Sequence, residues 1–280
     1  MKKQRLASWL IVTIIATIAY SQTKHTYIVQ TSDAHSCIEP IATNFKDTTQ
    51  AGKAGFIRRV ALLKELRKEH PDLLLLDCGD FSQGSIYYNL YKGKVEIDLM
   101  NEMQYDACSI GNHEFDYGLE NMAEIFQRAK FPIVCCNYDF KNKPCEKIVK
   151  PYTIIERGNL KIGIVGVGPK LEGLVLKNNY KNVKYKKPSK ATQPIVNKLR
   201  NKEHCDIIVC LSHLGYGENV DQDLNFIRQT TGIDVVLGGH SHSYFEAPKY
   251  IKNKENHEVV LNHTGKNAQF LGTLELEIEK

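Results

Sequence analysis

The sequence predicts an α/β protein in which stacked β-sheets form the core and helices lie outside. Two observations support this fold class. Short apolar runs rich in β-branched residues alternate along the chain with longer stretches whose apolar residues recur at helical spacing. In addition, residues 73–77 are almost continuously apolar, which is typical of a strand whose sheet is covered on both faces.

The first half of the chain alternates between the two kinds of element. Residues 26–30 are predicted to form a strand. Residues 56–69 have apolar side chains at helical spacing, and Pro71 closes this helix. The remaining elements predicted here are helix 95–103, helix 119–129, and strands 73–77, 107–110 and 133–136.

The second half begins with a hairpin. Two apolar runs, residues 152–155 and 160–167, flank Gly158 and Asn159, a pair typical of a tight turn. The elements predicted after the hairpin are helices 191–202 and 220–229, and strands 207–211, 235–237, 259–262 and 271–278. Because no repeat or low-complexity linker interrupts this succession, we expect one domain of two βα units over residues 24–280.

Residues 1–21 have the pattern of a secretory signal peptide. A basic start with Lys2, Lys3 and Arg5 precedes an apolar run, and residues 19–21 form a small-x-small cleavage pattern ending at Ser21. We expect an exported protein, periplasmic or secreted; the alternative is an uncleaved anchor, for which the run is short. Cleavage would remove three basic and no acidic residues, so the net charge falls from +5 to +2. Such a weak field argues against a nucleic acid or an anionic membrane as partner.

The eight cysteines are predicted to be mostly free thiols. Those in or beside apolar runs, where a thiol packs as a small hydrophobe, are Cys78, Cys108, Cys135, Cys136, Cys205 and Cys210. Only Cys37 and Cys145 lie in loop-like sequence, and they are the candidates for pairing.

Metal-binding side chains follow five of the predicted strands. They are Asp33 and His35, Asp80, Asn112 with His113, His213, and His240 with His242. Because strand ends in an α/β sheet converge on one crevice, residues far apart in sequence can share a site there. Mixed carboxylate, amide and imidazole ligands suit divalent Zn, Mn, Co or Fe.

Each of these residues also has an ordinary interpretation. Asp33 alone would be a turn former or helix cap, and His35 or His213 alone would be a polar loop residue. His240 and His242 are harder to explain in this way, because two imidazoles two residues apart follow a pair of glycines. The histidines outside this arrangement are His25, His70, His204, His257 and His263. Since half of the ten histidines follow strands, the joint pattern favours a metal site over coincidence.

The order of these motifs resembles that of the calcineurin-like metallophosphoesterases: D-x-H, GD, GNHE, H and GHSH. Three longer forms, TSDAH at residues 31–35, CGD at 78–80 and GNHEFDYG at 111–118, are similar to the 5′-nucleotidase branch. The resemblance covers residues 24–280. It implies a four-layer α-β-β-α sandwich and a metal-dependent phosphoric ester hydrolase.

By this resemblance, two divalent metal ions share the site. The first is placed on Asp33, His35, Asp80 and His242, and the second on Asp80, Asn112, His213 and His240. Asp80 would bridge two cations roughly 3.5–4 Å apart, which clamp the attacking and leaving oxygens of an in-line displacement. Two cations also stabilise a bridging hydroxide near neutral pH, which would attack phosphorus directly.

The resemblance gives His113 a catalytic role instead of a ligand role. His113 would stabilise the phosphoryl oxygens or protonate the leaving alkoxide, with Asp116 to orient and charge it. An interpretation of Asp116 as the cap of the following helix is compatible with this. Glu114 is expected to support the ligands from behind.

Three residues are candidates on the substrate side. Asn137 follows the strand predicted at 133–136 and matches a position that the family uses near the substrate phosphate. Arg58 and Arg59, in the segment AGKAGFIRR, resemble a family feature, with a solvated helix face as the equal alternative.

Relatives of this branch carry a second domain that stacks the base and supplies arginines to the phosphate. Residues 271–278 are predicted to be the last strand of the metal domain. We therefore expect the second domain to be absent here. Either a separately encoded polypeptide supplies it as a partner, or the metal domain works alone with looser selectivity.

Three functions follow. The leading one is an exported two-metal enzyme of nucleotide catabolism that hydrolyses phosphate monoesters of nucleotides. The second is a phosphodiesterase or pyrophosphatase acting on cyclic nucleotides or nucleotide sugars. The third, a metal-binding interaction module, is disfavoured because the ligand set, His113 and Asp116 are all present. The sequence does not distinguish well between the first two functions, because no motif has a nearby cluster of Tyr, Phe and Arg residues suited to base stacking.

Overall fold

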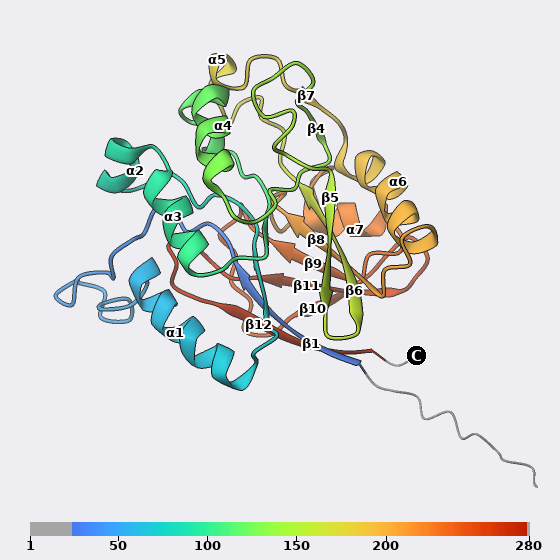
Figure 1. The fold of residues 1–280 in the computed structure, drawn as a ribbon, viewed down its shortest axis with the longest axis horizontal. Helices are drawn as coiled ribbons and strands as arrows, with labels where there is room; N and C mark the ends of the chain where they lie inside the picture. Colours follow the sequence, from blue (N-terminus) through green and yellow to red (C-terminus); the bar gives the residue numbers. More distant parts are fainter. Residues whose placement is uncertain (1–23, 279–280) are drawn as a thin grey trace, which may run out of the picture.

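In the computed structural model, two β-sheets lie between two groups of helices (Figure 1). The structure describes residues 24–278, so the signal peptide predicted at 1–21 lies outside the described residues. The first sheet has the order β12-β1-β2-β3, with β1 Lys24–Thr31, β2 Leu74–Asp77, β3 Ala107–Cys108 and β12 Gly272–Ile278. The second has the order β10-β11-β9-β8-β6-β5, with β5 Tyr152–Arg157, β6 Leu160–Val167, β8 Ile207–Ser212, β9 Val235–Gly238, β10 Lys249–Lys252 and β11 Glu258–His263.

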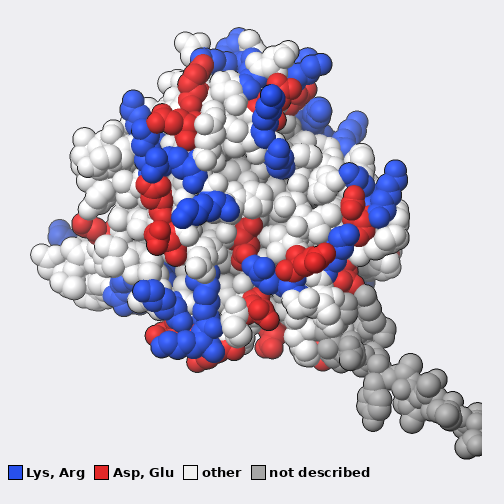
Figure 2. Space-filling model, viewed as in Figure 1, with Lys and Arg blue, Asp and Glu red and all other residues white. Residues whose placement is uncertain are grey.

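The helices cover the outer faces of the sheets. In Figure 1, α1 Phe56–Glu69, α2 Ile86–Tyr91, α3 Lys94–Glu102 and α4 Gly118–Arg128 lie toward the left, and α6 Pro188–Asn201 lies on the right near α7 Asp223–Arg228. The smaller elements are α5 Lys177–Tyr180, the 3₁₀ helix His113–Phe115, and the pair β4 Tyr138–Asp139 and β7 Lys184–Tyr185. Basic and acidic side chains are interspersed over the face seen in Figure 2.

Side chains of β2 explain why four layers form. Leu74 and Leu76 pack between the sheets against residues such as Val209. Leu75, and Leu73 just before the strand, point the other way and pack under the helices, because successive side chains of an extended chain alternate between its faces. A continuously apolar strand therefore serves two cores at once. The predicted α/β class and the four-layer α-β-β-α sandwich are confirmed.

Three predicted elements differ in the structure, the first being the strand predicted at 107–110, which is reduced to β3. Residues 133–136 form only isolated bridges, because three consecutive amides bond to three different segments: Val134 to Cys108, Cys135 to Lys150 and Cys136 to Gly166. The helix predicted at 220–229 is shortened to α7, because the chain before it forms a turn. The sequence also did not reveal α2, whose first amides bond to Oγ of Ser85.

The last strand joins the first sheet instead of the second. β12 pairs with β1 in antiparallel register from Lys24–Ile278 to Gln30–Gly272. All eight cysteines have free thiols, and Cys145, a candidate for pairing, is fully buried in the core. Between residues 24 and 278, the helices are all too short or too polar to cross a membrane.

Candidate metal centre

The loops after five strands meet at one edge of the two sheets, and they carry all seven predicted ligands. These are Asp33 and His35 after β1, Asp80 after β2, Asn112 after β3, His213 after β8, and His240 and His242 after β9. The first two loops are joined directly, since the amide of Asp33 donates to Gly79 O (2.9 Å) and that of His35 to Asp80 O (3.0 Å). Short strands that end together therefore bring distant residues into one place.

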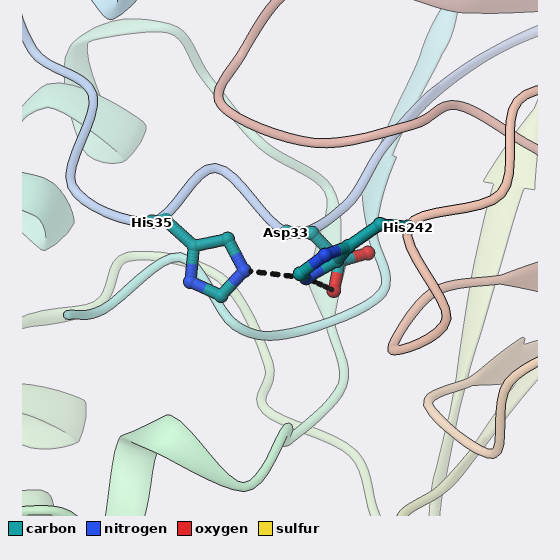
Figure 3. A group of neighbouring side chains, drawn as sticks. All are labelled: Asp33, His35 and His242. Carbon is teal, nitrogen blue, oxygen red and sulfur yellow. Dashed lines mark hydrogen bonds and ion pairs between the residues drawn. The ribbon is translucent and has the colours of Figure 1, made fainter. Parts of the chain in front are cut away.

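One group of ligands consists of Asp33, His35 and His242, whose ligand atoms all lie within 4.8 Å of one another. Figure 3 shows the side chains of Asp33 and His35, both from the loop after β1, pointing toward that of His242 from the loop after β9. Nε2 of His35 lies 2.9 Å from Nε2 of His242, which is 3.7 Å from Oδ1 of Asp33. These three residues belong to the set predicted for the first cation.

A second group consists of Asp80, His213 and His240, again within 4.8 Å. Nδ1 of His213 lies 2.7 Å from the carbonyl oxygen of Cys78. Because a carbonyl only accepts, Nδ1 carries the proton and Nε2 is left to face Oδ2 of Asp80, 2.9 Å away. A hydrogen bond from the other ring nitrogen is how proteins orient a metal-binding imidazole.

Asp80 lies between the two groups. Its carboxylate also forms a cluster with His35 and His113, whose ligand atoms lie within 4.8 Å of one another. Thus one carboxylate is in reach of imidazoles from both groups, which is the position that a bridging ligand requires.

Five of the seven predicted ligands have left-handed backbone conformations. Their φ values are 48° for Asp33, 46° for His35, 55° for Asp80, 71° for His240 and 56° for His242. Non-glycine residues rarely adopt this region, and such strain gathers at functional sites. The tight turns that it allows let each side chain fold back toward the strand ends.

The chemistry of the donor set fits divalent cations. Asp33 and Asp80 are both buried, and burial raises the pKa of Asp33 to about 7. Burial also lowers the pKa values of His35 and His240 to about 4, so both rings are neutral donors at neutral pH. The buried Oδ1 of Asn112 accepts no hydrogen bond from the residues that the structure describes. A cation would supply the missing partner for this oxygen and offset the charge of the two buried carboxylates.

His113 and Asp116 form a pair at the rim. Nδ1 of His113 lies 2.9 Å from Oδ2 of Asp116, and both side chains are about one-third exposed, at 29% and 32%. Burial lowers the pKa of His113, but the hydrogen bond to Asp116 and the nearby carboxylates outweigh it and raise the pKa overall. The N-cap of α4 is Tyr117, so the helix-cap interpretation of Asp116 does not describe this structure.

Glu114 joins two of the ligand loops from behind. Its Oε2 accepts hydrogen bonds from the amides of Asp80 (3.0 Å) and Gly111 (2.7 Å), and its Oε1 from that of Ser82 (3.2 Å). The side chain is buried, and burial raises its pKa to about 7. This is the supporting position expected for it.

The three residues predicted on the substrate side, Asn137, Arg58 and Arg59, differ in their exposure and in their hydrogen bonds. Both polar atoms of the Asn137 amide bond to the backbone of Gly168 at 2.8 Å, so a contact with substrate phosphate stays a prediction. Arg58 is exposed and lines a cavity of about 270 Å³ together with Phe270. Arg59 is buried and donates to the hydroxyl of Tyr105, so it is no solvated helix face.

The structure contains an aromatic pair near the site that the sequence did not reveal. The rings of Tyr244 and Phe270 stack with centroids 4.1 Å apart, and both remain partly exposed, at 49% and 40%. Tyr244 comes two residues after His242, and the segment leading to Phe270 contacts the site where the amide of Asn267 donates to Asp33 O (2.7 Å). No local pattern could reveal this pair, because the rings come from different loops.

Four layers with carboxylates and imidazoles gathered at the strand ends define the class of metal-dependent phosphoester hydrolases. The calcineurin-like phosphoesterase family matches residues 26–244, and the chain belongs to that family. The expected enzyme class and the resemblance to 5′-nucleotidases are thereby confirmed.

Several 5′-nucleotidases are similar to this chain. Snake venom 5′-nucleotidase of Crotalus adamanteus is 35% identical over 222 residues, 78% of this chain and 37% of the relative. The 5′-nucleotidase of Homo sapiens is 34% identical over 83% of this chain and 40% of its own length. The crystal structure of a 5′-nucleotidase precursor from Thermus thermophilus superposes with a TM-score of 0.82 at 30% identity, covering 90% of this chain and 51% of that one. The chain thus spans about two-fifths of the length of these curated relatives.

Proposed function

We propose that this protein is an exported enzyme that hydrolyses phosphate monoesters of nucleotides with two divalent cations. The observation that carries the proposal is the convergence of two ligand groups on Asp80, with His113 beside them. The first cation would be held by Asp33, His35, Asp80 and His242, and the second by Asp80, Asn112, His213 and His240. Zn, Mn, Co and Fe all suit this donor set.

Bound cations would activate water as the nucleophile and offset the charge on the phosphoryl group. The chain's own residues do the rest. The hydrogen bond to Asp116 fixes the ring of His113 and favours its protonated form. A protonated imidazole at this place can neutralise a phosphoryl oxygen and then donate its proton to the leaving alkoxide.

Nucleotides are the substrate class that the relatives' names and the aromatic pair support. The similar proteins from Crotalus adamanteus and Homo sapiens are both named 5′-nucleotidases. Tyr244 and Phe270 offer partly exposed ring faces on the loops that border the Asp33 group. Stacking of a base on an aromatic ring contributes roughly 1–3 kcal/mol per base.

The extent of the catalytic domain and the location of the protein are part of the same proposal. We place the domain at residues 24–280 and the signal peptide at 1–21. The snake venom relatives support an exported protein. A separately encoded specificity domain is the alternative source of base contacts.

A second candidate is hydrolysis of phosphodiester or pyrophosphate bonds in cyclic nucleotides or nucleotide sugars. A relative from Bacillus subtilis, 24% identical over 285 residues, is named a trifunctional nucleotide phosphoesterase. The same attack on phosphorus serves either kind of bond, so the geometry of the site favours neither.

A substrate panel separates these candidates. Nucleoside monophosphates, cyclic nucleotides, nucleotide sugars and a small aryl phosphate should be tested with Mn, Co and Zn, with and without any copurifying protein. We expect the monophosphates to be hydrolysed fastest by the isolated chain. Preference for a diester would overturn the leading candidate, and a rate that depends on the copurifying protein would indicate a partner. Replacing Tyr244 and Phe270 by Ala should raise KM for nucleotides and leave KM for the aryl phosphate unchanged.

A further inference from the structure

His263 lies outside the seven predicted ligands, yet it is nearly as buried as Asp33 and His213, the most buried of them. Its side chain is 1% exposed, and its Nε2 lies 2.8 Å from Oδ2 of Asp223, which is fully buried. We propose that this pair positions the second ligand group by holding the strand ends that carry His213 and His240. The inference rests on the proposed function in one respect, namely that these two histidines bind a cation.

The first link runs from Asp223 to the end of β8. Oγ of Ser212 donates a hydrogen bond of 2.5 Å to Oδ1 of Asp223. The same hydroxyl oxygen accepts a hydrogen bond of 3.2 Å from the amide of Leu214. Ser212 and Leu214 are the residues on either side of His213. The carboxylate of Asp223 thus holds the backbone on both sides of one ligand.

The second link runs from His263 to the end of β9. His263 and Gly238 are register partners in the parallel pair of β11 and β9. A Cβ atom on Gly238 would lie only 2.1 Å from Nε2 of His263, so the imidazole packs directly on this glycine. Gly238 precedes His240 by two residues. The position of the ring therefore determines where the loop with the second imidazole ligand leaves the sheet.

Surrounding contacts keep the pair in one geometry. The ring of His263 packs against those of Phe245 and Tyr216, with centroid distances of 5.1 and 6.0 Å. The amide of Phe245 donates to the carbonyl of His263 (3.0 Å), and that of Tyr216 to Oγ of Ser241 (2.9 Å). Ser241 lies between His240 and His242, so the contacts around His263 extend into the ligand loop after β9.

The pair is better explained by positioning than by stability. Burying two ionisable groups costs desolvation that their mutual attraction barely offsets, so apolar residues of similar volume would serve a core equally well. Both partners instead contact residues within two positions of His213 or His240. Residues that orient ligands from outside their immediate shell affect metal affinity strongly when they are changed.

Cation binding tests the proposal without reference to turnover. The chelator-stripped chain should be titrated with Co²⁺ by calorimetry and visible absorption, which report affinity and ligand geometry for each equivalent. Asp223→Asn and His263→Ala should weaken one of two equivalents by about tenfold or more and leave the other unchanged. His263→Gln keeps a donor near Asp223 and should restore part of the loss.

A matched control lies at the opposite end of the same strands. Oδ2 of Asp234 accepts a hydrogen bond of 2.7 Å from the amide of Ile208 at the start of β8. Asp234 directly precedes β9, so Asp234→Asn removes a carboxylate at the end of β8 and β9 that is opposite to the ligands. We expect it to lower the thermal midpoint and to leave both cation affinities unchanged.

Two results would overturn the inference while the wild type still binds two cations. One is wild-type affinity for both equivalents in folded Asp223→Asn and His263→Ala. The other is an equal loss of affinity in Asp234→Asn, which would indicate general loosening. Should Asp223→Asn not fold, Ser212→Ala removes a single hydroxyl and should weaken the same equivalent. A wild type that binds one cation would instead contradict the proposed function itself.

Discussion

The backbone N–H of His113 donates a hydrogen bond of 2.9 Å to Oδ1 of Asp80. The other oxygen of this carboxylate lies 2.9 Å from Nε2 of His213. The residue proposed to bridge the cations therefore also fixes the residue proposed to meet the phosphoryl group. A small displacement of Asp80 should disturb cation binding and the placement of His113 together.

Gly111→Ala tests this coupling. A Cβ atom at Gly111 would lie 2.1 Å from Oδ1 and 2.6 Å from the backbone nitrogen of Asp80. Since neither atom can yield without moving the ligand, we expect weaker cation binding, much slower hydrolysis and a loss of about 1–3 kcal/mol in unfolding free energy. Calorimetric titration and urea unfolding measure these. Gly158→Ala is the control, because Gly158 has open space around it and its φ of 55° strains an alanine through the backbone alone; an equal loss of cation binding in both variants would contradict the coupling.

His113→Ala should separate catalysis from metal binding. Removing a general acid or oxyanion partner lowers turnover by roughly 10²–10⁴-fold. We expect this fall in kcat with both cation equivalents retained, and a smaller fall for Asp116→Asn, which keeps the shape of the pair. Stopped-flow rates on a chromogenic phosphomonoester and metal analysis provide the two readouts. Loss of one cation equivalent would instead make His113 a ligand, as its place beside His35 and Asp80 would allow.

The ligand loops could be predicted from sequence because each is a local feature. Asp33 and His35 follow a strand within a few residues, as do His240 and His242, and the end of a buried strand is visible as the end of an apolar run. Parallel neighbours such as β8 and β9 then bring these ends to one edge. Local pattern and sheet geometry therefore predict that these residues lie together, whereas their assignment to two cations comes from the family resemblance.

The parts that could not be predicted depend on pairing between distant segments. Asp223 and His263 are 40 residues apart, and neither has a neighbour in sequence that signals its partner. Tyr244 and Phe270 stack although they lie on different loops, and no periodicity of the sequence indicates this pairing. Likewise, the side-chain amide of Asn137 bonds to the backbone of Gly168, 31 residues further along the chain.

Glu114→Gln should disturb the hydrogen bonds that support both ligand loops, and so lower both stability and cation affinity. The carboxylate accepts three backbone amides, and a Gln side chain has one acceptor oxygen and an NH₂ group that would face an N–H. Leaving a buried donor unpaired costs about 1–3 kcal/mol, and altered support behind metal ligands lowers affinity roughly 10–100-fold. Thermal unfolding with and without added Mn²⁺ measures both effects. Wild-type cation affinity in a folded Glu114→Gln chain would contradict the supporting role.

Glu96→Gln should change how stability depends on pH. Glu96 is fully buried, its Oε1 accepts a hydrogen bond from Ser36, and burial raises its pKa. The folded state thus binds this proton more tightly than the unfolded state, so the resulting stability is present below the unfolded pKa and lost as pH rises through the folded pKa. Gln carries no titrating proton, so the variant should gain stability relative to the wild type as the pH rises above about 4, the usual range of an unfolded glutamate, and through the raised pKa of folded Glu96. Urea midpoints across this range measure the difference. The exposed Glu65→Gln serves as control, and a gap between wild type and Glu96→Gln that stays constant with pH would rule out the buried, protonated carboxyl.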